Sequence, residues 1–243
     1  MNPTNSQQQI SPKFYARTGG FIYLIIIIAG FCGEMLIRNK LMVSGDVAAT
    51  FQNIQASQFL WRIGIAGDLL MHIGDVFLMW IFYMLLRPVN KNLALLVLLF
   101  NLVQTSVLVA NKLNMLEPLF LMGDAEYLKA FSLQQLQSIS YLSIKAHGFG
   151  FGNGLIFFGF VCILEGYLIF KSGFLPKFIG IFMQIAGLCY LVNSFSLILA
   201  PDFANSLFPA ILLPAFIAEL SLSLWLIVKG VNVIRWKELN QMS

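Results

Sequence analysis

Three ionisable side chains, Asp68, His72 and Asp75, interrupt an apolar stretch that is long enough to cross a lipid bilayer. Their spacing places all three within an arc of about 60° on one face of a helix. A charged side chain at the centre of a membrane costs about 2–3 kcal/mol or more, so this face must lie against protein or water. The three side chains are therefore the first candidates for a binding site or a proton relay.

Further polar groups are predicted at a similar depth on other spans. Counting residues along the spans puts Arg62, Asn111 and His147 in the outer parts of the second, third and fourth spans. The same count puts Glu219 near the middle of the last span. We expect these groups to converge on one outward-facing polar pocket. The predicted pocket residues are Arg62, Asp68, His72, Asp75, Asn111, His147 and Glu219.

Ion pairing offers a purely structural interpretation of the same residues. Arg62 lies less than two turns from Asp68, so a buried pair of Arg62 with Asp68 or with Glu34 would fix helix packing. Glu165 is predicted to pair with Lys171 at the opposite membrane boundary and to take no part in the site.

The two histidines suggest a metal site as an alternative. His72 and His147, with Asp68 and Asp75, are a possible two-histidine, two-carboxylate ligand set. The candidate metal ligands are Asp68, His72 and His147, whereas hydrogen-bonded histidines in the bundle interior are the simpler reading. The cofactor, if there is one, stays open.

The glycine-rich run at residues 147–154 is not a dinucleotide-binding loop. It has no preceding strand, and Asn153 stands where the third glycine of that motif would be. Two glycine pairs with a spacing of four instead predict close helix packing, which we expect to bring the fourth span against the second.

Composition identifies an integral membrane protein. The 243 residues are 58% hydrophobic and only 11% charged, whereas soluble domains carry about 25% charged residues. The net charge of +4 comes from cations in short loops, which report membrane topology and not nucleic-acid binding. The lipid bilayer is thus the expected partner, and the oligomeric state stays open.

Hydropathy predicts one all-α domain over residues 13–238, a polytopic bundle of six spans. The flanking segments 1–12 and 239–243 are predicted to be cytoplasmic tails, the first of them disordered. The spans are predicted at about residues 14–37, 59–86, 92–116, 141–170, 178–199 and 208–229.

The alternation of basic loops predicts that both termini are cytoplasmic. Two amphipathic segments are expected in the interface on the outer side. In one, Asp46 is the predicted N-cap of a helix that places Phe51 and Ile54 on one face. In the other, Ser132 and Gln135 form a predicted capping box before the fourth span.

Three segments, at residues 16–23, 61–89 and 166–190, resemble the bacterial family called domain of unknown function 4386. The most specific part is GYLIFKSGFLP at residues 166–176. The resemblance implies a six-helix protein of the bacterial inner membrane and no assigned activity. Positions similar to recurrent polar residues of the family are Arg62, Asp68, Asp75, His147, Ser172 and Tyr190.

Three functions follow as hypotheses. The first is binding or transport of a small ligand or cation through the polar pocket. The second is a metal-assisted intramembrane hydrolase of a lipid-like substrate, with Asp68 or Asp75 as general base. The third is a structural or accessory membrane subunit.

Overall fold

The structure is a computed structural model, and it describes residues 11–242. Within that range all regular structure is helical, and six helical segments are long and apolar enough to cross a membrane. The predicted all-α fold with six spans is therefore confirmed. The N-terminal tail was predicted at residues 1–12, and residues 1–10 of it lie outside the described residues.

Several of the six spanning segments combine more than one helix. In chain order they are α1 (Pro12–Cys32) continued by η1 (Gly33–Arg38) and α2 (Asn39–Leu41), α4 (Gln58–Leu86), α5 (Lys91–Asn111) with α6 (Leu113–Leu121), α7 (Leu133–Ser172), α8 (Lys177–Leu199), and η3 (Ala210–Leu212) with α10 (Leu213–Val228). The connecting and terminal helices are α3 (Val47–Ala56), η2 (Glu126–Ala130), α9 (Pro201–Leu207) and α11 (Val233–Met242).

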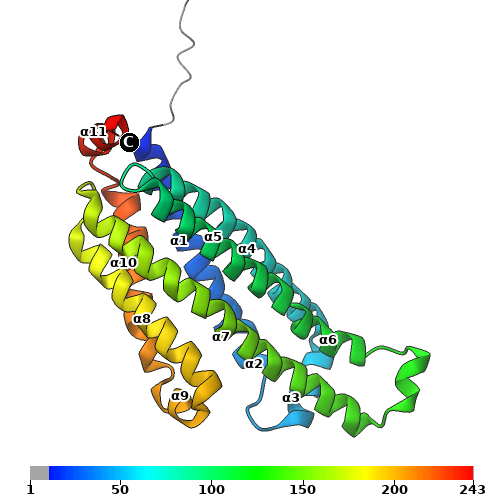
Figure 1. The fold of residues 1–243 in the computed structure, drawn as a ribbon. Helices are drawn as coiled ribbons and strands as arrows, with labels where there is room; N and C mark the ends of the chain where they lie inside the picture. Colours follow the sequence, from blue (N-terminus) through cyan, green and yellow to red (C-terminus); the bar gives the residue numbers. More distant parts are fainter. Residues whose placement is uncertain (1–10, 243) are drawn as a thin grey trace, which may run out of the picture.

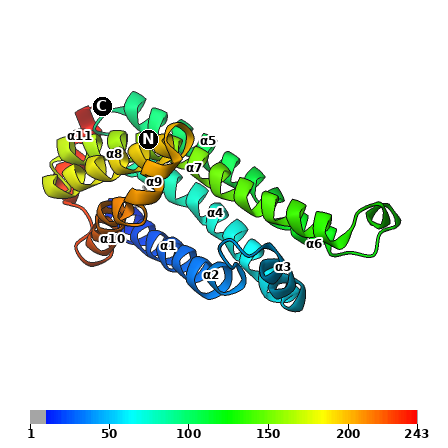
Figure 2. The ribbon, with the colours of Figure 1, turned by 90° about the horizontal axis from the view of Figure 1, so that it is seen from below.

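The six segments pack as a closed ring that follows the order of the chain. Helix α1 contacts α4, α4 contacts α5, α5 contacts α7, α7 contacts α8, α8 contacts α10, and α10 returns to α1. Figures 1 and 2 show the bundle from two directions. Each segment therefore contributes one face to a common interior.

The ring is closed tightly by glycines between α7 and α8. A Cβ atom at Gly166 would lie 2.5 Å from the Gly180 carbonyl oxygen, and one at Gly159 would meet Leu191 and the Gly187 carbonyl. Glycine at these positions lets the two backbones approach each other directly.

The glycine-rich run at 147–154 also packs closely, but against different helices from those predicted. Gly150 and Gly154 face Asn111 and Leu108 of α5, and Gly152 faces Leu197 of α8. The prediction that this run packs against the second span is wrong, because α5 lies between α4 and α7 in the ring.

The start of α1 and helix α11 lie at the same end of the bundle (Figure 1). There α11 folds back, and the Trp236 indole N–H donates a 2.9 Å hydrogen bond to the Leu85 carbonyl. The segment predicted as a C-terminal tail from residue 239 is helical as far as Met242.

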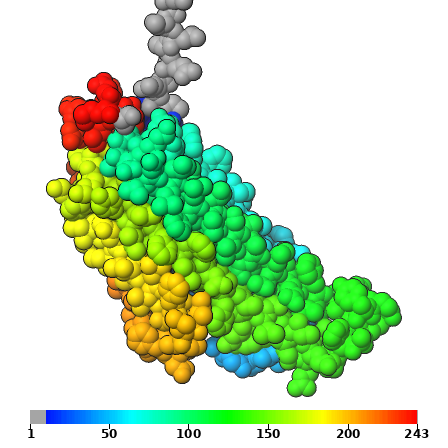
Figure 3. All heavy atoms as spheres, in the orientation of Figure 1, coloured from blue at the N-terminus to red at the C-terminus, as the bar shows by residue number. Residues whose placement is uncertain are grey.

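At the other end both predicted helix starts are present. The Asp46 side chain accepts a hydrogen bond from the Ala49 amide, and Ser132 and Gln135 form the reciprocal capping box. Helix α7 begins at Leu133, well before the predicted start of the fourth span at residue 141. Its 40 residues give a length of about 60 Å, twice the hydrocarbon core of a bilayer. The start of α7 and the preceding α6–η2 connection consequently protrude from the bundle (Figure 3).

Candidate functional site

Asp68 is the centre of a buried ion cluster in the interior of the ring. Its Oδ2 accepts hydrogen bonds from Lys112 Nζ at 2.7 Å and from Arg38 Nη1 at 2.8 Å. The side chains of Asp68, Lys112 and Arg38 are only 4%, 7% and 14% exposed. Arg38 also contacts Glu34 through Nε at 2.6 Å, but the Glu34 side chain is 53% exposed. One carboxylate thus serves two buried cations.

Both histidines adjoin this cluster. His147 Nε2 lies 3.4 Å from Lys112 Nζ, and the carbonyl of His147 accepts a hydrogen bond from the Asn111 side chain. His72 is one turn beyond Asp68 on α4, and its buried Nε2 has no hydrogen-bond partner within residues 11–242. The charges of Lys112 and Asp68 both act on the His72 ring. We call Arg38, Asp68, His72, Lys112 and His147 the ion centre.

Two of the segments that carry the ion centre lose regular α-helical geometry at that point. The first segment becomes a π-helix from Gly33 to Arg38, and Gly33 lies directly against the Asp68 carboxylate. The third segment breaks at Lys112, between the end of α5 and the start of α6. Such irregular turns inside helices are frequent at functional sites, and here they position Arg38 and Lys112.

Asp75, which the sequence groups with Asp68, belongs to a second buried cluster. Its Oδ2 accepts a 2.8 Å hydrogen bond from the Thr105 hydroxyl. The Tyr190 hydroxyl donates to Glu219, and the Tyr23 hydroxyl lies beside the same carboxyl group. The charges of Asp75 and Glu219 also act on Glu165 of α7. We call Tyr23, Asp75, Thr105, Glu165, Tyr190 and Glu219 the carboxyl centre.

The chain is similar to proteins of one family over most of its length. A family model described as domain of unknown function (DUF4386) matches residues 18–230. The chain belongs to the DUF4386 family. An uncharacterized protein of Archaeoglobus fulgidus is 31% identical over 166 residues, which is 68% of this chain and 83% of that protein. No solved structure gives a significant match. The DUF4386 match includes every residue of the ion centre and of the carboxyl centre, so both centres are part of the family domain.

Two sequence interpretations need correction in this DUF4386 protein. Arg62 is exposed, and within residues 11–242 it forms no ion pair with Asp68 or Glu34. Arg38 and Lys112 take its place. Glu165 is 1% exposed and is not the boundary partner of Lys171, because it points into the bundle interior. Of the predicted pocket residues, Asp68, His72 and His147 meet in the ion centre, Asn111 supports His147, and Asp75 and Glu219 lie in the carboxyl centre.

Sequence reasoning missed Arg38 and Lys112. Lys112 lies within the predicted third span, where a lone lysine among apolar residues is itself a signal of a buried partner. Arg38 lies one residue beyond the predicted end of the first span, and only the π-helical turn brings it back to Asp68.

The histidines and carboxylates are not arranged as a metal site. The described part of the chain contains no group of three or more His, Cys, Asp or Glu side chains that could hold a metal ion. Within the candidate set of Asp68, His72 and His147, the Lys112 ammonium occupies the position between Asp68 and His147. This geometry gives the metal-assisted hydrolase hypothesis no support.

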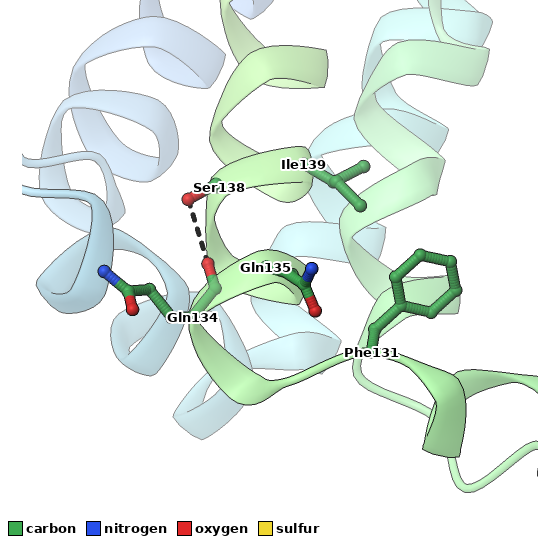
Figure 4. Close-up of a pocket in the computed structure, with 5 residues that line it drawn as sticks. All are labelled: Phe131, Gln134, Gln135, Ser138 and Ile139. Atoms are coloured by element: carbon green, nitrogen blue, oxygen red, sulfur yellow. Dashed lines mark hydrogen bonds between the residues drawn. The ribbon is translucent and has the colours of Figure 1, made fainter.

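The ion centre is closed from solvent in this conformation. A surface depression of about 350 Å³ at the start of α7 is lined by Phe131, Gln134, Gln135, Ser138 and Ile139 (Figure 4). A second depression follows α8 from Leu191 to Ala200. Neither includes a residue of the ion centre.

Proposed function

We propose that this DUF4386 membrane protein binds a small anion at the ion centre as part of transport across the bilayer. The observation that carries the proposal is the single Asp68 carboxylate held by both Lys112 and Arg38. The ligand would carry a carboxylate or phosphate-type group, since these groups match the donors of a lysine and an arginine.

The charges of the buried side chains favour an anion over a cation. Arg38 and Lys112 are two positive charges, and Asp68 supplies one negative charge among the most buried members of the cluster. The negative charge of Glu34 is half exposed and is therefore screened by solvent. A buried excess of positive charge is costly, so a second anionic group close to Lys112 would be stabilised.

Asp68 then has the role of a resident counter-ion. It neutralises part of the positive charge when the site is empty, and it competes with the ligand for the same two donors. The unpartnered Nε2 of His72 provides a further polar group for the ligand on the same side.

The irregular helices support transport and not static packing. Non-regular backbone inside a membrane is tolerated where it is buried in protein or lines a cavity. In transporters, ion and substrate sites are built where the helical backbone departs from regular geometry. The π-helical turn at residues 33–38 and the break at Lys112 flank the Asp68 carboxylate, where an opening motion would expose it.

For orientation we propose that the end carrying the termini faces the cytoplasm of a bacterial inner membrane. The support is the set of basic residues near that end, which follows the positive-inside rule. These residues are Lys13, Arg17, Arg87, Lys91, Lys171, Lys177, Lys229, Arg235 and Lys237. The ion centre would then be nearer the outer face.

Thermal unfolding of the purified protein in detergent tests the proposal. Phosphate, sulfate, acetate and chloride are added separately at equal ionic strength to the wild type, Lys112→Gln and Lys145→Gln. Lys145 is the matched control, because it is an exposed lysine on α7 near His147. We expect at least one anion to raise Tm of the wild type and of Lys145→Gln but not of Lys112→Gln. Equal stabilisation of all three proteins, or of none, contradicts anion binding at the ion centre.

A further inference from the structure

The carboxyl centre has a feature that the ion centre lacks, because every spanning segment contributes one side chain to it. These are Tyr23 from α1, Asp75 from α4, Thr105 from α5, Glu165 from α7, Tyr190 from α8 and Glu219 from α10. Helices that pack only for stability have no need to place six polar side chains in one region of the bundle interior inside a membrane, where each polar group is costly.

Glu165 marks an unfilled binding position in this centre. Its side chain is 1% exposed, and its Oε1 has no hydrogen-bond partner within residues 11–242. The other two carboxyl groups do have donors, Thr105 for Asp75 and Tyr190 for Glu219. A buried carboxyl oxygen without a donor is rare in native proteins and calls for a ligand.

Within the described part of the chain, no lysine or arginine forms an ion pair with these carboxyl groups. None of the ion pairs formed within residues 11–242 includes Asp75, Glu165 or Glu219. The titratable groups whose charges act on the centre from the surrounding helices are Tyr23, Asp75, Cys162, Glu165, Cys189, Tyr190 and Glu219. Three ionised carboxylates here would leave a buried negative charge without compensation, and a positively charged ligand on one of them lowers that charge.

The ligand that fits is the proton. A metal cation needs several oxygen ligands around one point, and the described residues hold no group of three acidic, histidine or cysteine side chains with that arrangement. A proton needs only one carboxyl oxygen, and the buried Glu165 Oε1 is such an oxygen without a donor. We infer that the carboxyl centre is a proton-binding site in which Glu165 carries an exchangeable proton.

The position of the carboxyl centre connects it to the ion centre. Asp68 and Asp75 are seven residues apart on α4, and Thr105 and Lys112 are seven residues apart along the third segment. Two helical turns correspond to about 10 Å along the bundle. His72 lies between the two aspartates on the same helix face, with its Nε2 free to take or give a proton. Binding of a proton next to an anion site would allow both to cross the membrane together. The proton site itself does not require the anion site.

Infrared spectroscopy of the protein in a detergent that contains no carbonyl group tests the inference. The carbonyl stretch of a protonated carboxylic acid is separate from the bands of carboxylates and amides. At neutral pH we expect such a band in the wild type, and we expect it to shift in D₂O because the proton exchanges with solvent. Glu165→Gln should remove most of the band, whereas Glu238→Gln, at an exposed residue of α11, should leave it unchanged.

Several outcomes would overturn the inference. A wild-type spectrum without the band at neutral pH would show that all three carboxyl groups are ionised. A band that disappears when sodium ions replace choline would assign the centre to a metal cation. If Glu165→Gln does not fold, Glu165→Asp serves as the second variant, and a band of unchanged position and intensity in it would refute the assignment to Glu165. All of these readouts are independent of the anion-induced change in Tm, so either proposal can fail alone.

Discussion

Lys112 Nζ lies 2.7 Å from Asp68 Oδ2, at the residue where α5 ends and α6 begins. The contact joins the second and third spanning segments and lies beside the π-helical turn of the first. The backbone of two helices is irregular beside this ion pair. The predictions for Asp68 and Lys112 depend on it.

Removing the Asp68 charge should destabilise the protein strongly. Asp68→Asn leaves the buried Lys112 without a counter-ion and Arg38 with only the half-exposed Glu34, which we expect to cost about 3–5 kcal/mol of unfolding free energy. Lys112→Met should cost less, because Arg38 still neutralises Asp68. Equilibrium unfolding in mixed micelles measures both. Glu34→Gln is the exposed control, with an expected effect below about 1 kcal/mol.

The double variant Asp68→Asn/Lys112→Met provides the internal check. Its loss of stability should be clearly smaller than the sum of the two single losses, because the charges interact directly. Additive losses would show that the pair is not formed in the membrane.

The Thr105 hydroxyl should stabilise the protein through its hydrogen bond to Asp75 and not through packing. Thr105→Val keeps the shape but leaves a buried carboxyl oxygen unpaired, at an expected cost of about 1–3 kcal/mol. Thr105→Ser keeps the hydroxyl and should recover most of the stability. Ser106→Ala, at the exposed neighbouring residue, should change it by less than about 0.5 kcal/mol. Equal losses in the valine and serine variants would argue against the bond.

Close packing of α7 on α8 should make Gly166 intolerant of a side chain. Gly166→Ala places a methyl group against the Gly180 carbonyl, which we expect to cost about 1–3 kcal/mol. Gly148→Ala on the same helix has open space around the new methyl group. It should be neutral or stabilising by up to about 1 kcal/mol, because alanine favours a helix over glycine. Thermal unfolding measures the Tm of the two variants. A Tm change of the same sign in both would be inconsistent with this packing.

The capping box of α7 should act locally. Ser132→Ala removes the hydrogen bond to the Gln135 amide and should lower the stability of the first turn by about 1 kcal/mol. Hydrogen–deuterium exchange should therefore become faster at the start of α7, while global Tm stays nearly constant because this segment protrudes from the bundle (Figure 3). Ser138→Ala, within the helix, is the control, and similar exchange in both variants would contradict the role of the cap.

Much of the fold is readable from the sequence, because apolar length and cap residues are local signals. The six spans, the cap at Asp46 and the capping box at Ser132 depend only on residues close together in the chain. Asp68 and His72 were predictable for the same reason, since two ionisable residues on one face of an apolar helix require an internal partner.

The partners themselves were not predictable, because they depend on tertiary geometry. Arg62 is the nearest basic residue to Asp68 in sequence, but Arg38 and Lys112 reach it through a π-helical turn and a helix break. Glu165 was assigned to the boundary by counting residues along its span. Its side chain is 1% exposed, so Glu165 lies on the face of α7 that is packed against the other helices. Neither irregular turn has a marker in the residues that form it.

Direct binding of radiolabelled phosphate and acetate to the protein in lipid nanodiscs is the measurement that tests the central claim most closely. For at least one of the two anions we predict saturable binding to the wild type and to Lys145→Gln. Lys112→Gln should bind that anion at least about tenfold more weakly, since it loses one of the two buried cations. The claim is contradicted if the wild type binds neither anion, or if Lys112→Gln binds as tightly as the wild type.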